Sequence, residues 1–166
     1  MLLGEKMNYN SGKGVLVFIC LVLISVLTVH SEYVSPEGYW KTIDDKTNEV
    51  KSIVKVWVDE NGKLNGQILK IFPKEGEDPD PVCDKCKGHL KDKKTIGMVF
   101  MWGFYKKDDK WIDGEIVDPE NGKQYHCQVY TKNGGKELKV YGYIKLIFKI
   151  GRTQTWIRTD KTALDG

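Results

Sequence analysis

The sequence predicts an all-β protein whose single domain is an up-and-down antiparallel β-barrel of about eight strands. Two observations lead to this prediction. After Ser31, short runs rich in β-branched and aromatic residues recur along the chain, and residues that favour turns separate them. The same region has no segment with a sustained helical period. A parallel sheet needs crossover helices, so α/β architectures are disfavoured.

The first 31 residues have the layout of a secretory signal peptide. Two lysines precede an uncharged apolar run from Val15 to Val29, and small residues suited to signal peptidase follow it. A helix that spans a bilayer needs about 20 apolar residues, so this shorter run makes a retained anchor the disfavoured alternative. We therefore expect residues 1–31 to be removed. The remaining domain, 32–166, is expected to be periplasmic or secreted, with no stable membrane span.

The charge balance argues against a nucleic-acid partner. The chain has 26 Lys and Arg residues and 23 Asp and Glu residues. Two basic residues and one acidic residue fall within residues 1–31, which leaves 24 against 22 and a net charge of +2 for the domain. Its lysines are scattered, and nucleic-acid binding requires a basic patch or stripe. The charge therefore indicates only solubility.

Eight segments carry the predicted strands. They span residues 37–44, 49–59, 63–73, 96–104, 110–118, 123–131, 138–148 and 153–159. Residues such as Asn61-Gly62, a strong hairpin signal, occupy the short connections between them. The connection at 73–95 is longer than usual and is expected to be a lid, a docking surface or partly structured.

Alternation along the strands predicts which side chains face the barrel interior, because successive side chains of a strand point to opposite faces. In segment 96–104, one face carries Ile96, Met98, Phe100, Trp102 and Phe104. In segment 123–131, the apolar face carries Tyr125, Cys127 and Val129. Segment 49–59 leaves its inner face open, since apolar residues occupy both of its faces.

The last strand carries an unusual row of polar side chains on one face. Arg152, Gln154, Trp156 and Arg158 share that face. If this face points inward, the guanidinium groups need partners, because a buried charge without an acceptor is strongly unfavourable. A protein carboxylate, an aromatic face or the anionic group of a ligand would each satisfy them.

The segment Gly38-Tyr39-Trp40 at the first strand, together with Arg158 on the last, resembles the closure of the lipocalin and fatty-acid-binding barrels. In those barrels the tryptophan of a Gly-x-Trp motif caps the base, and an arginine from the final strand lies over it. The resemblance implies a cation–π pair between Trp40 and Arg158, worth about 0.5–2 kcal/mol depending on burial.

A second resemblance covers essentially the whole domain. The segments GYWKTIDD, FPKEGEDPDPVCDKCKGH, IGMVFMWGF, DPENGKQYHCQVY and GRTQTWIR, in this order, resemble an exported bacterial family catalogued as domain of unknown function 2147. The resemblance implies a lipocalin-like (calycin-type) barrel with no established activity. The matching positions are Gly38, Trp40, Asp44, Asp45, Cys83, Asp84, Cys86, Gly88, Gly97, Gly142, Gly151, Arg152, Gln154 and Trp156. His89 departs from the family pattern.

Three cysteines remain after residue 31, and the oxidising compartment favours a structural disulfide between Cys83 and Cys86. A bridge from either of them to Cys127 is the main competitor, although Cys127 on an apolar strand face is most simply a core residue. Zinc bound by Cys83, Cys86, His89 and Cys127 is a weaker alternative, because the sequence has only one Cys-x-x-Cys pair. Thiol–disulfide exchange at Cys83 and Cys86 is a third reading, but no thioredoxin-like βαβ pattern surrounds them.

Other candidate chemistry is sparse, so we predict no enzyme, no catalytic residue, no metal and no cofactor. The sequence has no Gly-x-Ser-x-Gly motif and no phosphate-binding glycine motif. The acidic residues of segment 73–95 are expected to be solvated and balanced by neighbouring lysines, in preference to a calcium site. Asp44 and Asp45 are interpreted as turn residues.

The leading hypothesis is an exported, non-enzymatic barrel that binds a small apolar or amphipathic molecule, including one that carries a carboxylate. Access would be from the end with the 73–95 connection. The predicted ligand-binding residues are Trp40, Met98, Phe100, Trp102, Tyr125, Arg152, Gln154, Trp156 and Arg158. The alternatives are an envelope thiol–disulfide oxidoreductase using Cys83 and Cys86, and an interaction module with a filled barrel that docks to an envelope protein.

Overall fold

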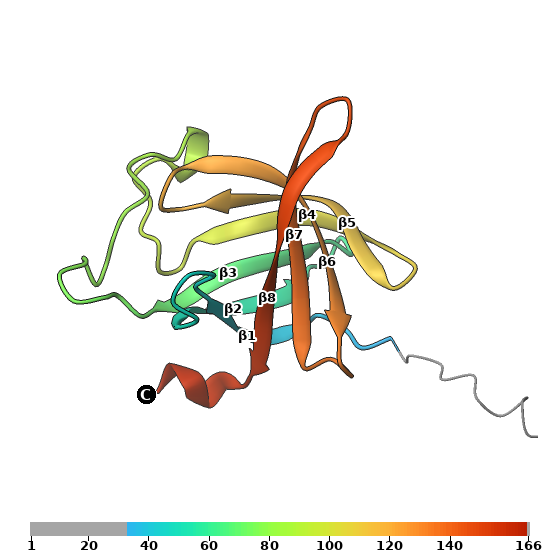
Figure 1. The fold of residues 1–166 in the computed structure, drawn as a ribbon, viewed down its shortest axis with the longest axis horizontal. Coiled ribbons are helices and arrows are strands. Elements are labelled where there is room, and N and C mark those ends of the chain that lie inside the picture. The colour runs from blue at the N-terminus through green and yellow to red at the C-terminus, as the bar shows by residue number, and fades with distance from the viewer. Residues whose placement is uncertain (1–32, 166) are drawn as a thin grey trace, which may run out of the picture. The chain divides into compact units, whose positions relative to one another are not determined.

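A computed structural model describes residues 33–165, and these residues form the predicted closed barrel (Figure 1). The predicted signal peptide at 1–31 lies outside the described residues. The strands are β1 (Gly38–Ile43), β2 (Val50–Val58), β3 (Leu64–Ile71), β4 (Val99–Lys107), β5 (Lys110–Asp118), β6 (Lys123–Lys132), β7 (Glu137–Lys145) and β8 (Lys149–Thr159). Two short 3₁₀ helices, η1 (Gly88–Leu90) and η2 (Lys161–Leu164), accompany them.

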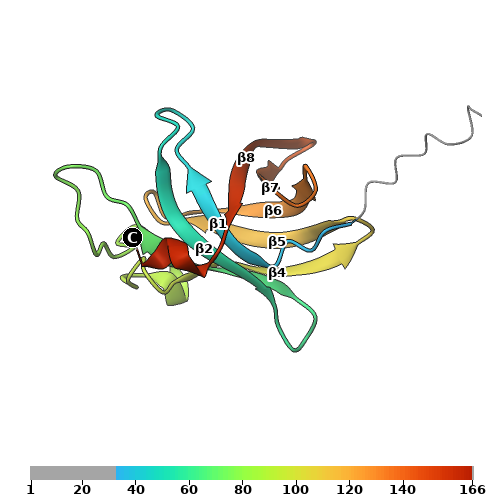
Figure 2. The same cartoon turned by 90° about the horizontal axis from the view of Figure 1, so that it is seen from below.

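The strand order confirms the up-and-down topology. Each strand pairs antiparallel with the next strand along the chain, and β1 closes the barrel by pairing with β8. The closing register sets Trp40 opposite Arg158. Figure 2 shows the strands curving around the barrel. We call the end with the β1–β2, β3–β4, β5–β6 and β7–β8 connections the open end, and the opposite end the closed end.

Some strand limits differ from the prediction. β4 begins at Val99 and not at Ile96, because Gly97 adopts a φ of 89° that interrupts the extended backbone. β7 ends at Lys145, and β8 begins four residues before the predicted start, at Lys149. Residues 146–148 therefore form a turn, although their apolar side chains predicted a strand.

Shifts of register explain where simple alternation fails. In β2, a shift between Ile53 and Val54 leaves both residues buried, and Val54 and Val56 belong to the core. The β3–β4 register shifts on both sides of Gly66, and Met101 is fully buried next to buried Phe100. The alternating set predicted for 96–104 is therefore correct at Met98, Phe100 and Phe104 but misses Met101.

Large side chains fill the half of the barrel near the closed end, and two glycines make room for them. A Cβ at Gly114 would lie 2.3 Å from the Phe104 ring, and a Cβ at Gly66 would lie 2.5 Å from Cγ of Met101. Non-bonded carbon atoms do not approach this closely, so any larger residue at these positions would displace Phe104 or Met101. The closed half is consequently a packed core.

The closed end is built around the predicted pair of Trp40 and Arg158. The guanidinium carbon lies 4.2 Å from the centroid of the Trp40 ring, which confirms the cation–π contact. Arg158 also donates hydrogen bonds to the carbonyl oxygens of Ser35, Glu37 and Gly135. A Cβ at Gly38, whose φ is 131°, would come within 2.9 Å of the guanidinium. The Gly-x-Trp motif thus needs glycine so that the arginine can cross beneath it.

The β1–β2 turn uses Asp44 as predicted. Oδ1 of Asp44 accepts hydrogen bonds from the backbone N–H of Lys46 at 2.8 Å and of Thr47 at 3.0 Å. These bonds favour the charged carboxylate and lower the pKa of Asp44 from 3.8 to about 2, the bond from Thr47 contributing most.

The lowered pKa of Asp44 predicts a pH-dependent contribution to stability. A carboxylate with a lower pKa in the folded state stabilises the fold above pH 3.8, and this stabilisation is lost as the pH falls towards about 2. We expect Asp44→Ala to unfold at lower urea concentration than the parent protein at pH 7. The difference should shrink progressively below pH 4. The matched control is Glu60→Ala, in the exposed turn between β2 and β3. A difference that stays constant down to pH 2.5 would contradict the role of the carboxylate charge.

A candidate ligand cavity at the open end

A cavity of about 970 Å³ occupies the open half of the barrel, and all eight strands contribute to its wall. Its deep part is apolar, because inward-facing residues of β3, β4, β7 and β8 meet there. These are Ile68, Phe100, Val140 and Trp156, all of them buried. Pockets that hold drug-sized molecules have volumes of about 300–1,000 Å³. The barrel is therefore hollow enough, on its open side, for one small molecule.

Trp156 and Phe100 form one wall of the cavity. Their rings are stacked, with centroids 6.1 Å apart and planes 28° from parallel. Nε1 of Trp156 donates to Oε1 of Gln154 at 3.3 Å, so the polar edge of this buried indole is satisfied within the protein.

A glycine of β7, the strand next to β8, also lines the cavity. Gly142 lies on β7 in register with Cys127 of β6 and Arg152 of β8, and it lines the cavity. A Cβ placed on Gly142 would lie 3.9 Å from the nearest side-chain atoms, those of Ile116 and Tyr125. That distance is an ordinary van der Waals contact, so a side chain can start at Gly142 without a clash at its Cβ.

The polar row of β8 leads from the cavity to its mouth. Three of the four residues of this row, Arg152, Gln154 and Trp156, line the cavity, whereas Arg158 does not. Nη1 of Arg152 lies 3.0 Å from Oδ2 of Asp45, and Nε2 of Gln154 donates to the same oxygen at 3.4 Å. The Arg152 side chain is 71% exposed. This is a solvated ion pair at the mouth, which in water contributes little to stability.

Asp45 is the functional candidate that the sequence reasoning missed. It lies in the β1–β2 turn, as interpreted, and its carboxylate also contacts Arg152 and Gln154 of the polar row of β8. The signal in the sequence was indirect, because an inward-facing arginine requires an acceptor somewhere. Barrel closure brings the β1–β2 connection next to β8, and this proximity is not visible from local sequence.

Charged residues of both signs surround the mouth. Lys51 on β2 pairs with Glu120 in the β5–β6 turn, and Nζ of Lys74 lies 3.7 Å from Oδ2 of Asp44. Lys51, Glu120 and Arg152 also line the cavity. These pairs are exposed or partly exposed, so water and arriving charged groups compete with them.

Four of the nine predicted ligand-binding residues lie away from the cavity. Trp40 and Arg158 form the closed end, where protein groups already bind the guanidinium. Met98 is buried in the core beside the start of β4. Trp102 is half-buried and points its ring towards His89, with centroids 6.0 Å apart. Simple alternation misplaced Trp102 because the β3–β4 register shifts at Gly66. Phe100, Tyr125, Arg152, Gln154 and Trp156 do line the cavity.

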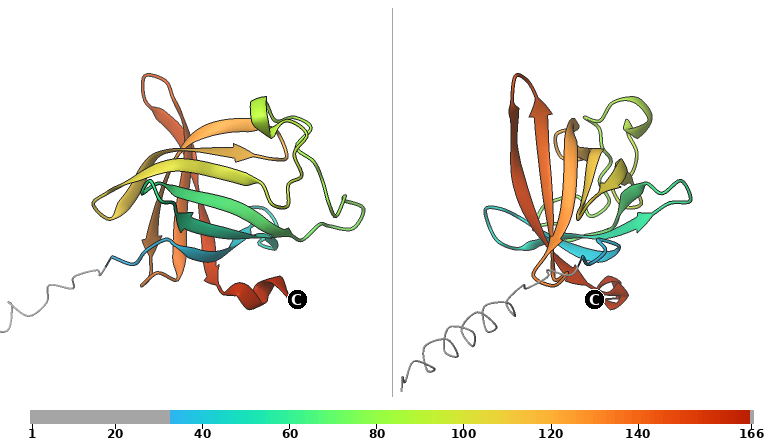
Figure 3. Two further views of the ribbon diagram at one scale, coloured as in Figure 1. Left: turned by 180° about the vertical axis from the view of Figure 1, so that it is seen from behind. Right: turned by 90° about the vertical axis from the view of Figure 1, so that its right-hand side faces the viewer.

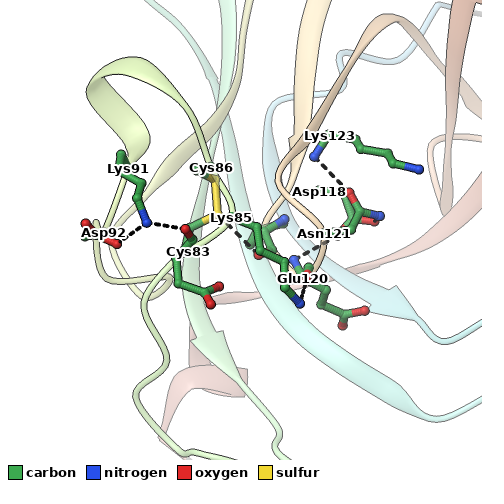
Figure 4. The surroundings of a disulfide bond; sticks show 11 residues. Cys83, Lys85, Cys86, Lys91, Asp92, Asp118, Glu120, Asn121 and Lys123 are labelled. Atoms are coloured by element: carbon green, nitrogen blue, oxygen red, sulfur yellow. Dashed lines mark hydrogen bonds and ion pairs between the residues drawn. A yellow bond between two sulfur atoms is a disulfide. The ribbon is translucent and has the colours of Figure 1, made fainter.

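The long β3–β4 connection carries a disulfide between Cys83 and Cys86. The connection is partly structured, since it contains η1 and an isolated bridge between Val82 and Lys94. It is docked on the β5–β6 turn, where Nζ of Lys85 donates to the carbonyl oxygen of Glu120 at 3.1 Å (Figure 4). A Cβ at Gly122 would lie 2.0 Å from the carbonyl oxygen of Lys85, so this close approach of two backbones requires glycine.

The Cys83–Cys86 disulfide distinguishes among the roles that the sequence left open for the cysteines. Cys127 is free and buried, so the bridge from Cys83 or Cys86 to Cys127 does not form. Burial raises the pKa of the Cys127 thiol. The nominal zinc ligands are not assembled, and residues 33–165 contain no group of three or more His, Cys, Asp and Glu side chains that could hold a metal ion. Cys83 and Cys86 are themselves buried.

Burial of both sulfurs predicts a disulfide that resists reduction in the folded protein. An attacking thiolate must reach a sulfur atom, and neither Cys83 nor Cys86 offers an exposed surface. We expect dithiothreitol to reduce the bond slowly until urea unfolds the chain. The short loop predicts a stability loss of about 2 kcal/mol or less for the Cys83→Ser/Cys86→Ser variant. Alkylation followed by mass spectrometry measures both thiols, with Cys127 as the internal reference for unfolding. Rapid reduction of the native protein would contradict a structural role.

Comparisons with known proteins agree with the barrel. The profile of a family described as "Uncharacterized protein conserved in bacteria (DUF2147)" matches residues 38–158. Protein HP1028 of Helicobacter pylori, described as belonging to the lipocalin family, has a similar structure with a TM-score of 0.65 and 20% sequence identity. The similarity covers 80% of this chain and 88% of HP1028. No curated protein matches the sequence. Among residues 33–165, no helix has the length and apolar character needed to cross a bilayer.

Proposed function

The chain belongs to the bacterial family of uncharacterized proteins DUF2147 and folds as a lipocalin-like barrel, and from this premise we propose that it is an exported protein that binds one small apolar or amphipathic molecule. The observation that carries the proposal is the cavity of about 970 Å³ at the open end of the barrel. Eight-stranded barrels of this kind either fill their interior with side chains or hold one small ligand.

The apolar part of the ligand belongs in the deep half of the cavity. Phe100 and Trp156 offer stacked aromatic surface there, and Val140 offers an aliphatic surface beside them. Each methylene group transferred from water to such a surface contributes about 0.8 kcal/mol. A hydrocarbon chain or a flat ring system therefore suits this region better than a sugar or a nucleotide.

The polar part of the ligand belongs at the mouth. Arg152 and Gln154 present donors there, and both now share a single acceptor, Asp45. A carboxylate on the ligand would bind Arg152 in place of this exposed partner, because the existing ion pair is weak in water. This arrangement favours an amphipathic molecule with an acidic head group.

The disulfide supports export. Disulfides persist in the periplasm and outside the cell, whereas the cytosol keeps thiols reduced. A buried Cys83–Cys86 bridge within a long loop is typical of a structural disulfide. The two alternative functions receive no support. Burial of both sulfurs disfavours an oxidoreductase, and the hollow open half disfavours a filled barrel that acts only through its surface.

Fluorescence titration with cis-parinaric acid, a fluorescent fatty acid, tests the proposal. We expect saturable binding with one molecule per chain and displacement by palmitic acid. Arg152→Gln should weaken palmitic acid binding by about three- to tenfold and leave binding of the corresponding fatty alcohol unchanged, because only the acid uses the guanidinium. Equal weakening for acid and alcohol would contradict the assigned head-group site. Absence of any saturable binding would contradict the proposed function.

A further inference from the structure

The tip of the β7–β8 hairpin exposes a continuous run of large apolar side chains. Leu146 is 67% exposed, Ile147 is 99% exposed and Phe148 is 68% exposed. Ile144 and Ile150, on the two strands behind them, are also exposed. Figures 1 and 3 show that this hairpin projects beyond the ends of the neighbouring strands. The apolar tip therefore stands clear of the barrel.

The other short hairpin turns of the barrel have the opposite character. The β2–β3, β4–β5, β5–β6 and β6–β7 turns consist mainly of Asp, Asn, Glu and Gly residues. Such residues dominate turns because they tolerate the required backbone conformations and remain hydrated. The side chains of Leu146, Ile147 and Phe148 form no hydrogen bonds with water, so their exposure does not stabilise the turn. Contiguous exposed apolar surface of this kind marks a contact with another apolar phase.

Two lysines lie directly behind the apolar tip. Lys145 and Lys149 face each other in the last register pair of the hairpin, and both are exposed. Nζ of Lys149 lies 4.5 Å from the centroid of the Tyr143 ring. Apolar residues at the end of a projection, with cations one residue behind them, match the structure of an anionic membrane surface. The apolar side chains enter the acyl boundary while the ammonium groups meet the lipid phosphates.

The tip is also continuous with the cavity. Ile144 and Ile150 line the mouth of the cavity and form the base of the exposed tip. On β7 a non-polar strip thus runs from the hairpin through Ile144 and Gly142 to buried Val140, beside the polar residues Arg152 and Gln154 of β8. A ligand that left a bilayer along this surface would not have to cross bulk water.

We propose that residues 144–150 form a membrane-docking tip that inserts into the surface of an anionic bilayer and sets the mouth of the cavity against it. The docking is carried by the exposed apolar tip and its paired lysines. It does not require a loaded cavity, and only the transfer of a ligand along the tip depends on the proposed function.

Sedimentation with lipid vesicles tests the docking. The experiment uses the protein after export, without the predicted signal peptide. We expect it to sediment with vesicles that contain phosphatidylcholine and phosphatidylglycerol, and much less with phosphatidylcholine alone. The Ile147→Asn/Phe148→Ser variant should bind at least about tenfold more weakly, since two apolar side chains no longer insert. The Lys145→Gln/Lys149→Gln variant should lose about ten- to thirtyfold on the anionic vesicles only.

The matched control is Ile157→Thr, which changes an exposed isoleucine of the same strand far from the tip. It should sediment like the parent protein. Cis-parinaric acid titration of each variant without vesicles should be unchanged, which separates failure of docking from failure of the cavity. Equal sedimentation of the tip variant and the parent would overturn the proposal. A second outcome would also overturn it: the parent protein does not bind anionic vesicles but forms dimers, and the tip variant abolishes these dimers. The tip would then join two copies of the chain.

Discussion

Replacing Gly142 with phenylalanine is expected to abolish ligand binding while leaving the barrel folded. Gly142 lines the cavity, and a Cβ built on it would make only ordinary contacts, 3.9 Å from atoms of Ile116 and Tyr125. A phenyl ring built there occupies the volume that an apolar ligand needs. The ligand would have to displace a buried ring at a cost of about 3 kcal/mol, which corresponds to a loss of about 100-fold or more in affinity.

The free energy of unfolding should not fall with the loss of ligand binding in Gly142→Phe. Glycine within a strand is destabilising by about 0.5–1 kcal/mol because its backbone loses more freedom on folding. Gly142→Phe is therefore expected to be as stable as the parent protein or slightly more stable. Cis-parinaric acid titration and urea unfolding measure the two effects. Gly142→Ala is the matched control, and it should retain binding within about twofold because one methyl group leaves most of the cavity open. Undiminished binding by Gly142→Phe would show that ligands bind elsewhere.

The second large effect is expected at the closed end. Trp40→Ala should lower the free energy of unfolding by about 3–5 kcal/mol, because the indole is fully buried beneath Arg158. Arg158→Ala should lower it by about 2–3 kcal/mol, since three backbone carbonyl oxygens lose their charged donor.

Arg152→Ala provides the matched control for Arg158→Ala on the same strand. Its guanidinium is mostly exposed and pairs only with Asp45 among the residues that the structure describes, so the loss should stay within about 1 kcal/mol. Urea unfolding at pH 7 measures all three variants. If the two arginine variants were equally stable, the division of the β8 row into a structural end and a ligand-facing end would be incorrect.

The fold was largely predictable because its signals are local. Strand periodicity and turn residues predicted the eight strands and their order. The Gly-x-Trp resemblance correctly paired Trp40 with Arg158, and the spacing of Cys83 and Cys86 together with the expected compartment correctly predicted their disulfide. In each case the interaction depends on residues near in sequence or on a motif with one known geometry.

The cavity was only partly predictable because its details depend on register. Phe100 and Trp156 follow simple alternation and line the cavity, whereas the shifts at Gly66 turn Trp102 away from it. Asp45 reaches Arg152 only because the barrel closes. Residues 146–148 were predicted as strand from their composition, and the turn that they form depends on where β8 pairs with β7.

The central claim is that a small amphipathic molecule occupies the barrel, and the indole N–H resonances of the five tryptophans test it most directly. Palmitic acid is added to isotope-labelled protein, and Trp156→Phe identifies the resonance of the cavity tryptophan. We predict that the Trp156 resonance shifts and saturates at one molecule per chain, while those of Trp57 on β2 and Trp111 on β5 stay in place. A Trp156 resonance that does not move, or five resonances that drift together without saturation, would contradict a bound ligand in the cavity.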